Sequence, residues 1–406
     1  MRDNCARPRG STWKGEIRLQ TSRITPRQIL FLAMGTLTGT STLLLPAPVA
    51  GSDQWLAILM GAALGLALTF VYQSLWKALR RVQGENLPHT AATQPAPVNP
   101  GMFVRAAGPA WGRILAFLYW GFFTHLAALV LRNLVTSIGS EVLPRTPTPV
   151  LVTAFLALAV WSASQGTEGV ARLAEAIIPM TYLASFVIIG LSIITPHLVD
   201  LRRLLPAFDR SWQPVVQGSW EAFTFPFAEL VALLPFGLAS RPPERTAAMV
   251  RRGIVLTAVM LMLMAARTLA ALGPAEVSRY VFPGFIATEL IEVGGFVERI
   301  DAVALFIWIN AGFVKLTLTL LAAAQSLFDL LGLERREETT PLLLSLGLVV
   351  GALTTGLYSS PVDMVIFAKC TYPVYAPVFE VLGPFLLLTL ARRRNLSAQP
   401  VTPQRE

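Results

Sequence analysis

The stretch "MGTLTGTSTLLLP", Met34 to Pro46, lies inside the first long apolar run of the chain. A lipid-spanning helix is expected to carry mainly leucine, isoleucine and valine, yet this stretch holds two glycines, four threonines and a serine. These residues favour a helix less than leucine does. Gly35 and Gly39 form a GxxxG pattern, which is typical of close helix packing, but a broken helix at a binding site has the same composition.

Composition places the chain in a membrane. Of its 406 residues, 54% are hydrophobic and only 14% are charged, with a mean hydropathy of +0.57. A soluble domain carries about 25% charged residues. The net charge of +9 is spread between apolar runs, so we predict no nucleic-acid partner. Cys5 and Cys370 lie far apart and the three histidines are scattered, so we expect no metal site, no cofactor and no enzymatic activity.

The apolar runs predict an all-α membrane protein. A bilayer core of about 30 Å needs about 20 mostly apolar residues per helix. Ten runs approach or exceed this length, at residues 28–49, 55–78, 111–136, 150–165, 169–195, 221–239, 250–272, 300–333, 341–358 and 372–391.

Charge sets the expected orientation, because cytoplasmic loops carry an excess of Lys and Arg. Ten spans place the basic arm 1–27 and the basic tail 392–406 in the cytoplasm, around one transmembrane domain at 28–391. An odd number of spans would put the tail outside. We further expect Asp200–Trp212 and Tyr280–Val297 to lie in the membrane interface.

The ten spans divide into two halves of five, about 28–195 and 221–391. The sixth span reads "FTFPFAELVALLPFG", Phe223 to Gly237, and contains Pro226, Glu229 and Pro235. The first helix of each half is therefore interrupted, a pattern typical of transporters built from inverted repeats.

Broken helices within a membrane free backbone N–H and C=O groups, which suit the carboxylate and the ammonium of a small zwitterion such as an amino acid. Polar and aromatic residues on neighbouring helices could complete such a pocket. The residues that we predict to bind the nutrient are Gly35, Thr36, Gly39, Thr40, Ser41, Tyr119, Phe223, Thr224, Phe225, Glu229, Trp308 and Asn310.

Ionisable residues inside the spans are costly in lipid and are usually functional. Glu229 is predicted either to bind a proton or the nutrient's amine, or to pair with Lys315. Arg267, near the end of its span, is predicted to anchor the helix by extending to the interface. The residues that we assign to gating or proton coupling are Glu229, Lys315, Glu380, His125, Arg172 and Glu175; Arg172 and Glu175 have a spacing that lets them pair.

Five stretches resemble the B subunits of bacterial spore germinant receptors, or endospore germination permeases, of the amino acid-polyamine-organocation superfamily. They are "ITPRQILFLAMGTLTGTSTLLLP", "WLAILMGAALGLAL", "EGVARLAEAIIP", "FPFAELVALLPF" and "GGFVERIDAVALFIW". The resemblance runs from Ile24 to Arg394. It implies a LeuT-type five-plus-five fold with broken helices 1 and 6, and a place in the spore inner membrane.

The same resemblance implies an A subunit and a lipoprotein C subunit as partners, and the sensing of amino acids. The family usually has glycine where this chain has Ala228, which makes the second break less permissive. Two other functions stay open: an amino acid permease or proton-coupled antiporter in which Glu229 carries the proton, and a passive channel or structural scaffold.

Overall fold

The computed structural model describes residues 24–82, 101–205, 211–240, 242–292, 300–333 and 339–397. Within these ranges the regular secondary structure is helical and contains no β-strand. The predicted arm lies almost wholly outside the described residues, and so does the end of the tail from residue 398.

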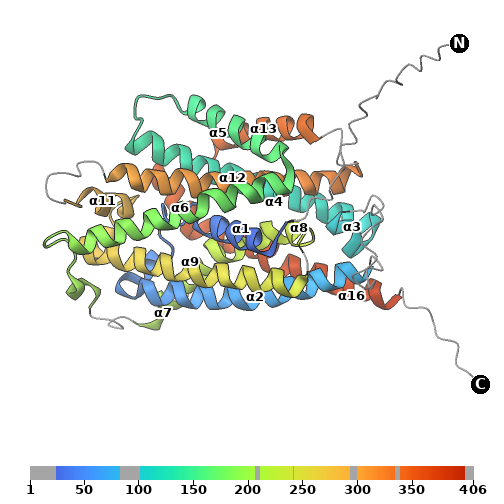
Figure 1. Ribbon diagram of the computed structural model, residues 1–406, viewed down its shortest axis with the longest axis horizontal. Coiled ribbons are helices and arrows are strands. Elements are labelled where there is room, and N and C mark those ends of the chain that lie inside the picture. Colours follow the sequence, from blue (N-terminus) through green and yellow to red (C-terminus); the bar gives the residue numbers. More distant parts are fainter. Residues whose placement is uncertain are drawn as a thin grey trace, which may run out of the picture.

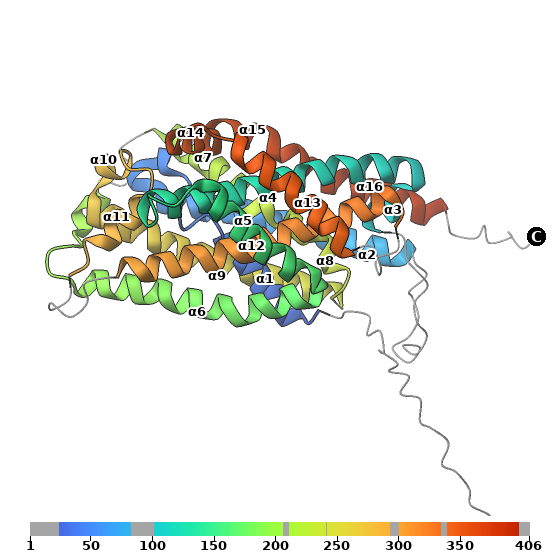
Figure 2. The ribbon, with the colours of Figure 1, turned by 90° about the horizontal axis from the view of Figure 1, so that it is seen from above.

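The helices form one elongated bundle (Figures 1 and 2). The first half contains α1 (Pro26–Thr38), α2 (Gln54–Val82), α4 (Pro109–Glu141), α5 (Thr148–Ser164) and α6 (Gly166–Ile194), with the short helices η1 (Pro48–Asp53) and α3 (Met102–Ala107) between them. The second half contains α7 (Trp212–Ala222), α8 (Leu234–Gly237), α9 (Pro243–Leu272), α12 (Asp301–Leu331), α13 (Thr339–Gly356) and a last span that ends with α16 (Gly383–Ser397). We refer below to the α3 end and the α11 end of the bundle (right and left in Figure 1).

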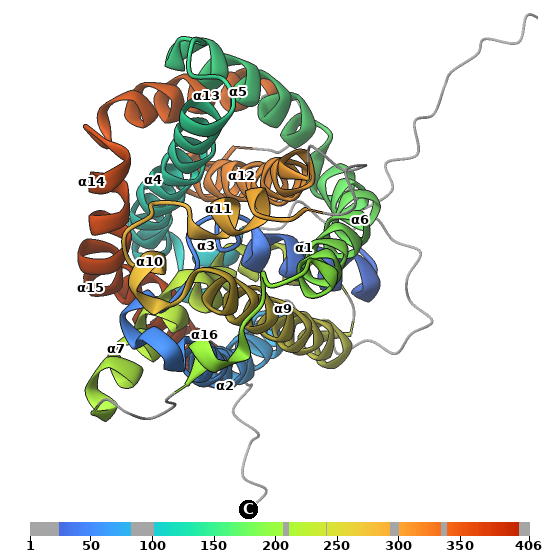
Figure 3. The same ribbon diagram turned by 90° about the vertical axis from the view of Figure 1, so that its left-hand side faces the viewer.

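Within the described ranges these elements confirm the predicted all-α membrane fold, and they follow the order of the ten predicted spans. Six helical segments are long and apolar enough to cross a membrane, and two shorter apolar helices, α5 and α13, accompany them. Viewed along the bundle, α1 and α12 lie in the interior, whereas α5 and α13 lie at the periphery (Figure 3). The most interior helices thus include the first broken helix and the helix that carries Lys315.

The first predicted span, 28–49, is only partly helical. α1 ends at Thr38, and the Thr38 carbonyl accepts turn hydrogen bonds from the N–H groups of Ser41 and Thr42. Gly39 has φ −8° and ψ −95°, outside the helical range. The cluster of glycine and hydroxyl residues therefore ends the helix at mid-bundle, as such residues do when side chains replace the regular backbone bonds.

The sixth span is interrupted over eleven residues. α7 is followed by a π-helical turn, η3 (Phe223–Phe227), by 3-10 turns, η4 (Ala228–Leu233), and by the single turn α8. Phe225, before Pro226, has φ −130° and ψ 104°, as expected of a residue that precedes proline. Ala228 has a regular helical conformation, φ −81° and ψ −18°. Alanine at this position therefore does not oppose the break.

One face of α2 stabilises this broken helix. The Tyr72 hydroxyl lies 3.5 Å from the Ala228 carbonyl, and the Trp76 indole N–H donates to the Leu234 carbonyl at 3.0 Å. One turn further along α2, Arg80 donates to the Ser240 carbonyl. Backbone groups without partners are costly in lipid, so these side chains compensate for the lost helical bonds.

The tenth span begins about eleven residues before its predicted start at 372. It runs through α14 (Pro361–Ile366), the π-helical turn η5 (Phe367–Thr371), α15 (Tyr372–Pro377), a second π-helical turn η6 (Val378–Leu382) and α16. The polar residues Lys369 to Thr371 lower the local hydropathy, which explains the late predicted start.

The two predicted interfacial segments form short helical turns. Asp200–Trp212 contributes one 3-10 turn, η2 (Leu201–Leu204), and Arg203 donates to the Ala271 carbonyl at the end of α9. Tyr280–Val297 contributes α11 (Pro283–Glu289). Residues 206–210 and 293–299 lie outside the described ranges.

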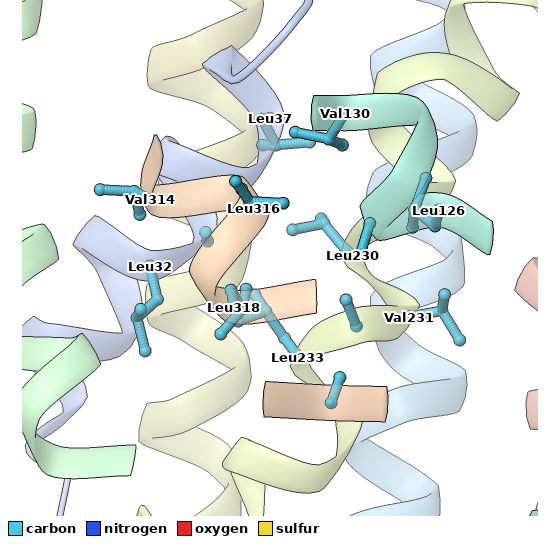
Figure 4. Close-up of a cluster of buried hydrophobic side chains, with 14 of the residues drawn as sticks. Leu32, Leu37, Leu126, Val130, Leu230, Val231, Leu233, Val314, Leu316 and Leu318 are labelled. Carbon is cyan, nitrogen blue, oxygen red and sulfur yellow. The ribbon is translucent and has the colours of Figure 1, made fainter. Parts of the chain in front are cut away.

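Apolar side chains hold the breaks in place. One cluster contains Leu32 and Leu37 of α1, Leu126 and Val130 of α4, Leu230, Val231 and Leu233 of η4, and Val314, Leu316 and Leu318 of α12 (Figure 4). α4 and α12 pack closely: a Cβ on Gly312 would lie 2.4 Å from Leu134 Cδ2. Apolar side chains of α1, α4 and α12 therefore pack around the breaks.

Candidate functional site

A buried ion pair joins the second break to α12. Lys315 Nζ lies 2.6 Å from Glu229 Oε2, and the two side chains are 0% and 1% exposed. The ammonium also donates to the Thr40 hydroxyl at 3.3 Å and lies 5.0 Å from the centre of the Phe225 ring. Lys315 therefore contacts both broken helices at once.

Gly39 makes room for this lysine. A Cβ at Gly39 would lie 2.3 Å from Lys315 Cδ and 2.9 Å from Lys315 Cβ. Only glycine lets α1 pass so close to the lysine stem. The close approach that the sequence suggested at Gly39 is thus made by a residue of the chain itself.

A second carboxyl group extends the polar cluster toward the tenth span. The Tyr372 hydroxyl lies 3.2 Å from Glu229 Oε1 and 2.7 Å from Glu380 Oε1. Glu380 is fully buried in the π-helical turn η6, and its Oε2 has no hydrogen-bond partner. Lys315, Glu229, Tyr372 and Glu380 form a continuous chain, which we call the buried quartet.

A small cavity lies beside the buried quartet. It measures about 20 Å³, enough for about one water molecule. Its walls come from the first break, α4, the second break and the tenth span. The lining residues are Thr40, Leu44, Leu126, Leu129, Val130, Asn133, Phe225, Glu229, Tyr358, Phe367, Ala368 and Tyr372.

Asn133 is a polar lining residue that sequence reasoning missed. Its side chain is 7% exposed, and its Oδ1 atom is buried without a partner. A buried amide oxygen without a donor is costly. In the sequence, the position of this asparagine within a long apolar span was the feature that could have indicated a site residue. The sequence could not show that it shares a cavity with Thr40 and Phe225.

The other predicted binding residues near the breaks serve packing or backbone bonding. A Cβ on Gly35 would lie 2.7 Å from Val314 Cγ1, so Gly35 is a packing contact. The Thr36 and Ser41 hydroxyls donate to the carbonyls one turn before them in α1. Thr224 donates to the Glu221 carbonyl, and Phe223 packs against Trp220.

Four further candidates lie apart from the cavity lining. The Tyr119 hydroxyl donates to the Phe379 carbonyl at 2.7 Å. His125 is half-buried near the ring of Tyr375. Trp308 packs on Phe282 and Phe285 toward the α11 end. The Asn310 amide donates to the Phe306 carbonyl of its own helix.

Arg172 and Glu175 do not pair with each other, and each forms an ion pair with a different residue. Arg172 lies 2.5 Å from Glu168, one turn earlier in α6, and Glu175 lies 3.3 Å from Arg27 in the first turn of α1. The Arg27–Glu175 contact ties the start of α1 to α6. The arginine side chain is 73% exposed, so this pair contributes little to stability.

Comparison with known proteins identifies the family. A family model described as "Spore germination protein" matches residues 23–90 and 100–359. The chain belongs to this spore germination protein family. Spore germination protein KB of Bacillus subtilis (strain 168) is 24% identical over 377 residues, which cover 92% of this chain and 95% of that protein. Spore germination protein YndE of the same organism is 21% identical over 92% of this chain and 98% of its own length.

Solved transporter structures share the fold. MHP1, a nucleobase-cation-symport-1 family transporter with bromovinylhydantoin bound, aligns over 94% of this chain and 95% of its own with a TM-score of 0.58 and 12% identity. MhsT in complex with L-phenylalanine aligns over 91% and 96% (TM-score 0.57, 15% identity). A Na⁺-coupled sialic acid symporter aligns over 94% and 91% (TM-score 0.64, 9% identity). The predicted five-plus-five architecture is confirmed, and the chain is an integral membrane protein. Its family is one of spore germination proteins and not a family of enzymes.

Proposed function

We propose that this chain is the membrane-embedded B subunit of a nutrient germinant receptor. In this proposal a small amino-acid-like germinant binds at mid-membrane, in the cavity between the two helix breaks. The protein lies in the spore inner membrane with both termini in the cytoplasm, and an A subunit and a lipoprotein C subunit transmit its response. Membership of the spore germination family supports the role, and the site's chemistry supports the ligand class.

The main support for this ligand class is the amide oxygen of Asn133, which is buried without a hydrogen-bond partner in a residue that lines the cavity. A ligand ammonium would satisfy this oxygen, while the apolar residues of α4 would contact a small side chain. The cavity is smaller than any amino acid, so binding requires the surrounding helices to move apart. Such a ligand binds the expanded arrangement more tightly than the closed one and so increases the population of the expanded arrangement. This change in population is what the partner subunits would detect.

The test is a thermal-shift panel of the common amino acids on the purified chain in lipid nanodiscs. We expect at least one amino acid to raise the melting temperature of the wild type. Asn133→Leu, which removes the acceptor and fills the cavity, should weaken that ligand at least about tenfold. Thr40→Val provides a second lining variant of nearly unchanged volume.

Asn310→Leu is the matched control, because Asn310 lies in a span but not in the cavity lining. It should bind as the wild type does. Equal binding by Asn133→Leu, Thr40→Val and the wild type would place the site elsewhere. The absence of any shift across the panel would instead favour a channel or scaffold.

A proton-coupled permease is the second candidate, favoured by the buried quartet. It contains two carboxyl groups but one ammonium, and the Tyr372 hydroxyl has a single proton to donate to two carboxyl oxygens. One further proton between Glu380 and Tyr372 would complete the hydrogen bonds. That proton could travel with a substrate.

Uptake into proteoliposomes separates the two candidates. A permease should accumulate a labelled amino acid when the outside is acidic, and Glu380→Gln, which mimics the protonated acid, should abolish this pH dependence. A receptor should bind the amino acid without accumulating it.

A further inference from the structure

A second small cavity lies toward the α11 end, separate from the buried quartet. It measures about 10 Å³, the space of about one water molecule. Its walls come from the end of the first break, from α6, α9 and α12, and from α11, which covers it. The polar side chains in its lining are Thr42, Arg267, Thr268, Thr288 and Trp308.

Arg267 is a buried cation in this lining. Its side chain is 5% exposed, so it does not extend to the interface as the sequence suggested. Nη2 donates to the Thr288 hydroxyl at 2.9 Å, whereas Nε is buried without a partner. Among the described residues, no carboxylate pairs with this guanidinium, although the chain pairs Lys315 with Glu229. A buried charge without a counter-charge is costly.

Thr42 contributes a second unsatisfied group from another element. Its hydroxyl oxygen is buried without a partner and lines the same cavity. α11 lies close by, because a Cβ on Gly284 would come within 3.6 Å of the Thr42 carbonyl. Two unsatisfied donor groups, one from the first break and one from α9, therefore face one small space that α11 also lines.

We propose that this cavity binds a small monovalent anion of halide size. An anion would supply the missing counter-charge of Arg267 and accept hydrogen bonds from Nε and from the Thr42 hydroxyl. A water molecule would satisfy the hydrogen bonds but not the charge. The ligand would bridge the first break, α9 and the α11 cover, so its binding favours the arrangement in which α11 rests on the bundle.

The test measures the melting temperature of the full chain in nanodiscs at constant ionic strength. Chloride replaces either isethionate or acetate, two organic anions that a cavity of about 10 Å³ does not accommodate. We expect a saturable rise of about 2 °C or more in the wild type. A rise with chloride but not with acetate supports a halide site, whereas an equal rise with both anions would contradict it.

Arg267→Gln should remove the anion dependence. Thr42→Val, which removes only the hydroxyl that would donate to the anion, should weaken the anion about tenfold and serves if Arg267→Gln fails to fold. Arg203→Gln is the matched control, because Arg203 lies at the same end of α9 and already donates to backbone carbonyls; it should keep the dependence. Equal melting temperatures of the wild type in all three salts, or a full anion response in Arg267→Gln or Thr42→Val, would overturn the proposal.

Discussion

Lys315 serves two purposes at the residue scale: its stem packs on Gly39, and its ammonium pairs with Glu229. The sequence predicted a close approach at Gly39 and offered an ion pair as one role for Glu229. It could not join the two, because Lys315 and Thr40 are 275 residues apart in the chain. The first break is therefore built around an internal cation, and the space for a ligand lies beside it.

Breaking this ion pair should be costly. Lys315→Met leaves the Glu229 carboxylate buried without its cation, and we expect it to lower the free energy of unfolding by about 3–5 kcal/mol. The double variant Lys315→Met, Glu229→Leu should recover most of that loss, since no isolated charge remains. The measurement is equilibrium unfolding in mixed micelles.

The exposed pair between Lys77 and Glu244 provides the control. Its two side chains are 41% and 56% exposed at an N–O distance of 2.9 Å. Lys77→Met should therefore change stability by less than about 1 kcal/mol. If both lysine variants had the same small effect, Lys315 would not be a buried charge in the membrane-embedded protein.

At the scale of elements, the sequence located the two broken helices but not the form of each break. Pro226 and the Gly-Thr cluster signalled the interruptions. The π-helical turns of the tenth span gave no comparable signal, because they depend on tertiary contacts such as the bond between Tyr372 and Glu380. Asn133 of α4 and Tyr372 of the tenth span were missed for the same reason, because their role depends on the residues that they face in the folded chain.

Two glycines test the packing of α4 on α12. Gly312→Ala would place its Cβ 2.4 Å from Leu134, whereas Gly121, also in a long helix, has nothing within 4 Å of such an atom. We expect Gly312→Ala to destabilise by about 1–3 kcal/mol through overpacking. Gly121→Ala should stabilise by about 0.5–1 kcal/mol, because alanine favours a helix more than glycine does. Unfolding of both variants in the same micelles measures the difference, and equal effects would contradict the close α4–α12 contact.

At the scale of the whole molecule, hydropathy and charge were enough to predict the ten-helix architecture. Long apolar runs locate the helices that cross the membrane. The interruptions in the first and sixth spans indicate that the chain consists of two related halves. The ligand, the partners and the orientation depend on contacts outside the chain. The described part begins beside Ala239, and the last span ends beside α2 and α3, so both ends lie on one side of the bundle.

The excess of Lys and Arg in the arm and the tail predicts that both ends lie on the cytoplasmic side of the membrane. An epitope tag after Glu406 should resist protease added to intact protoplasts, whereas a tag inserted at Arg145, between α4 and α5, should be cleaved. Lysed protoplasts provide the control, in which both tags are accessible. Cleavage of the C-terminal tag in intact protoplasts would reverse the proposed orientation.

The central claim is that a nutrient binds between the two broken helices, against Asn133 and Thr40. The most direct measurement is a cryo-electron microscopy structure of the chain in nanodiscs with the amino acid that stabilises it most. We expect an enlarged cavity with ligand density within hydrogen-bond distance of Asn133 Oδ1. Ligand density elsewhere, with Asn133 and the buried quartet unchanged, would contradict it.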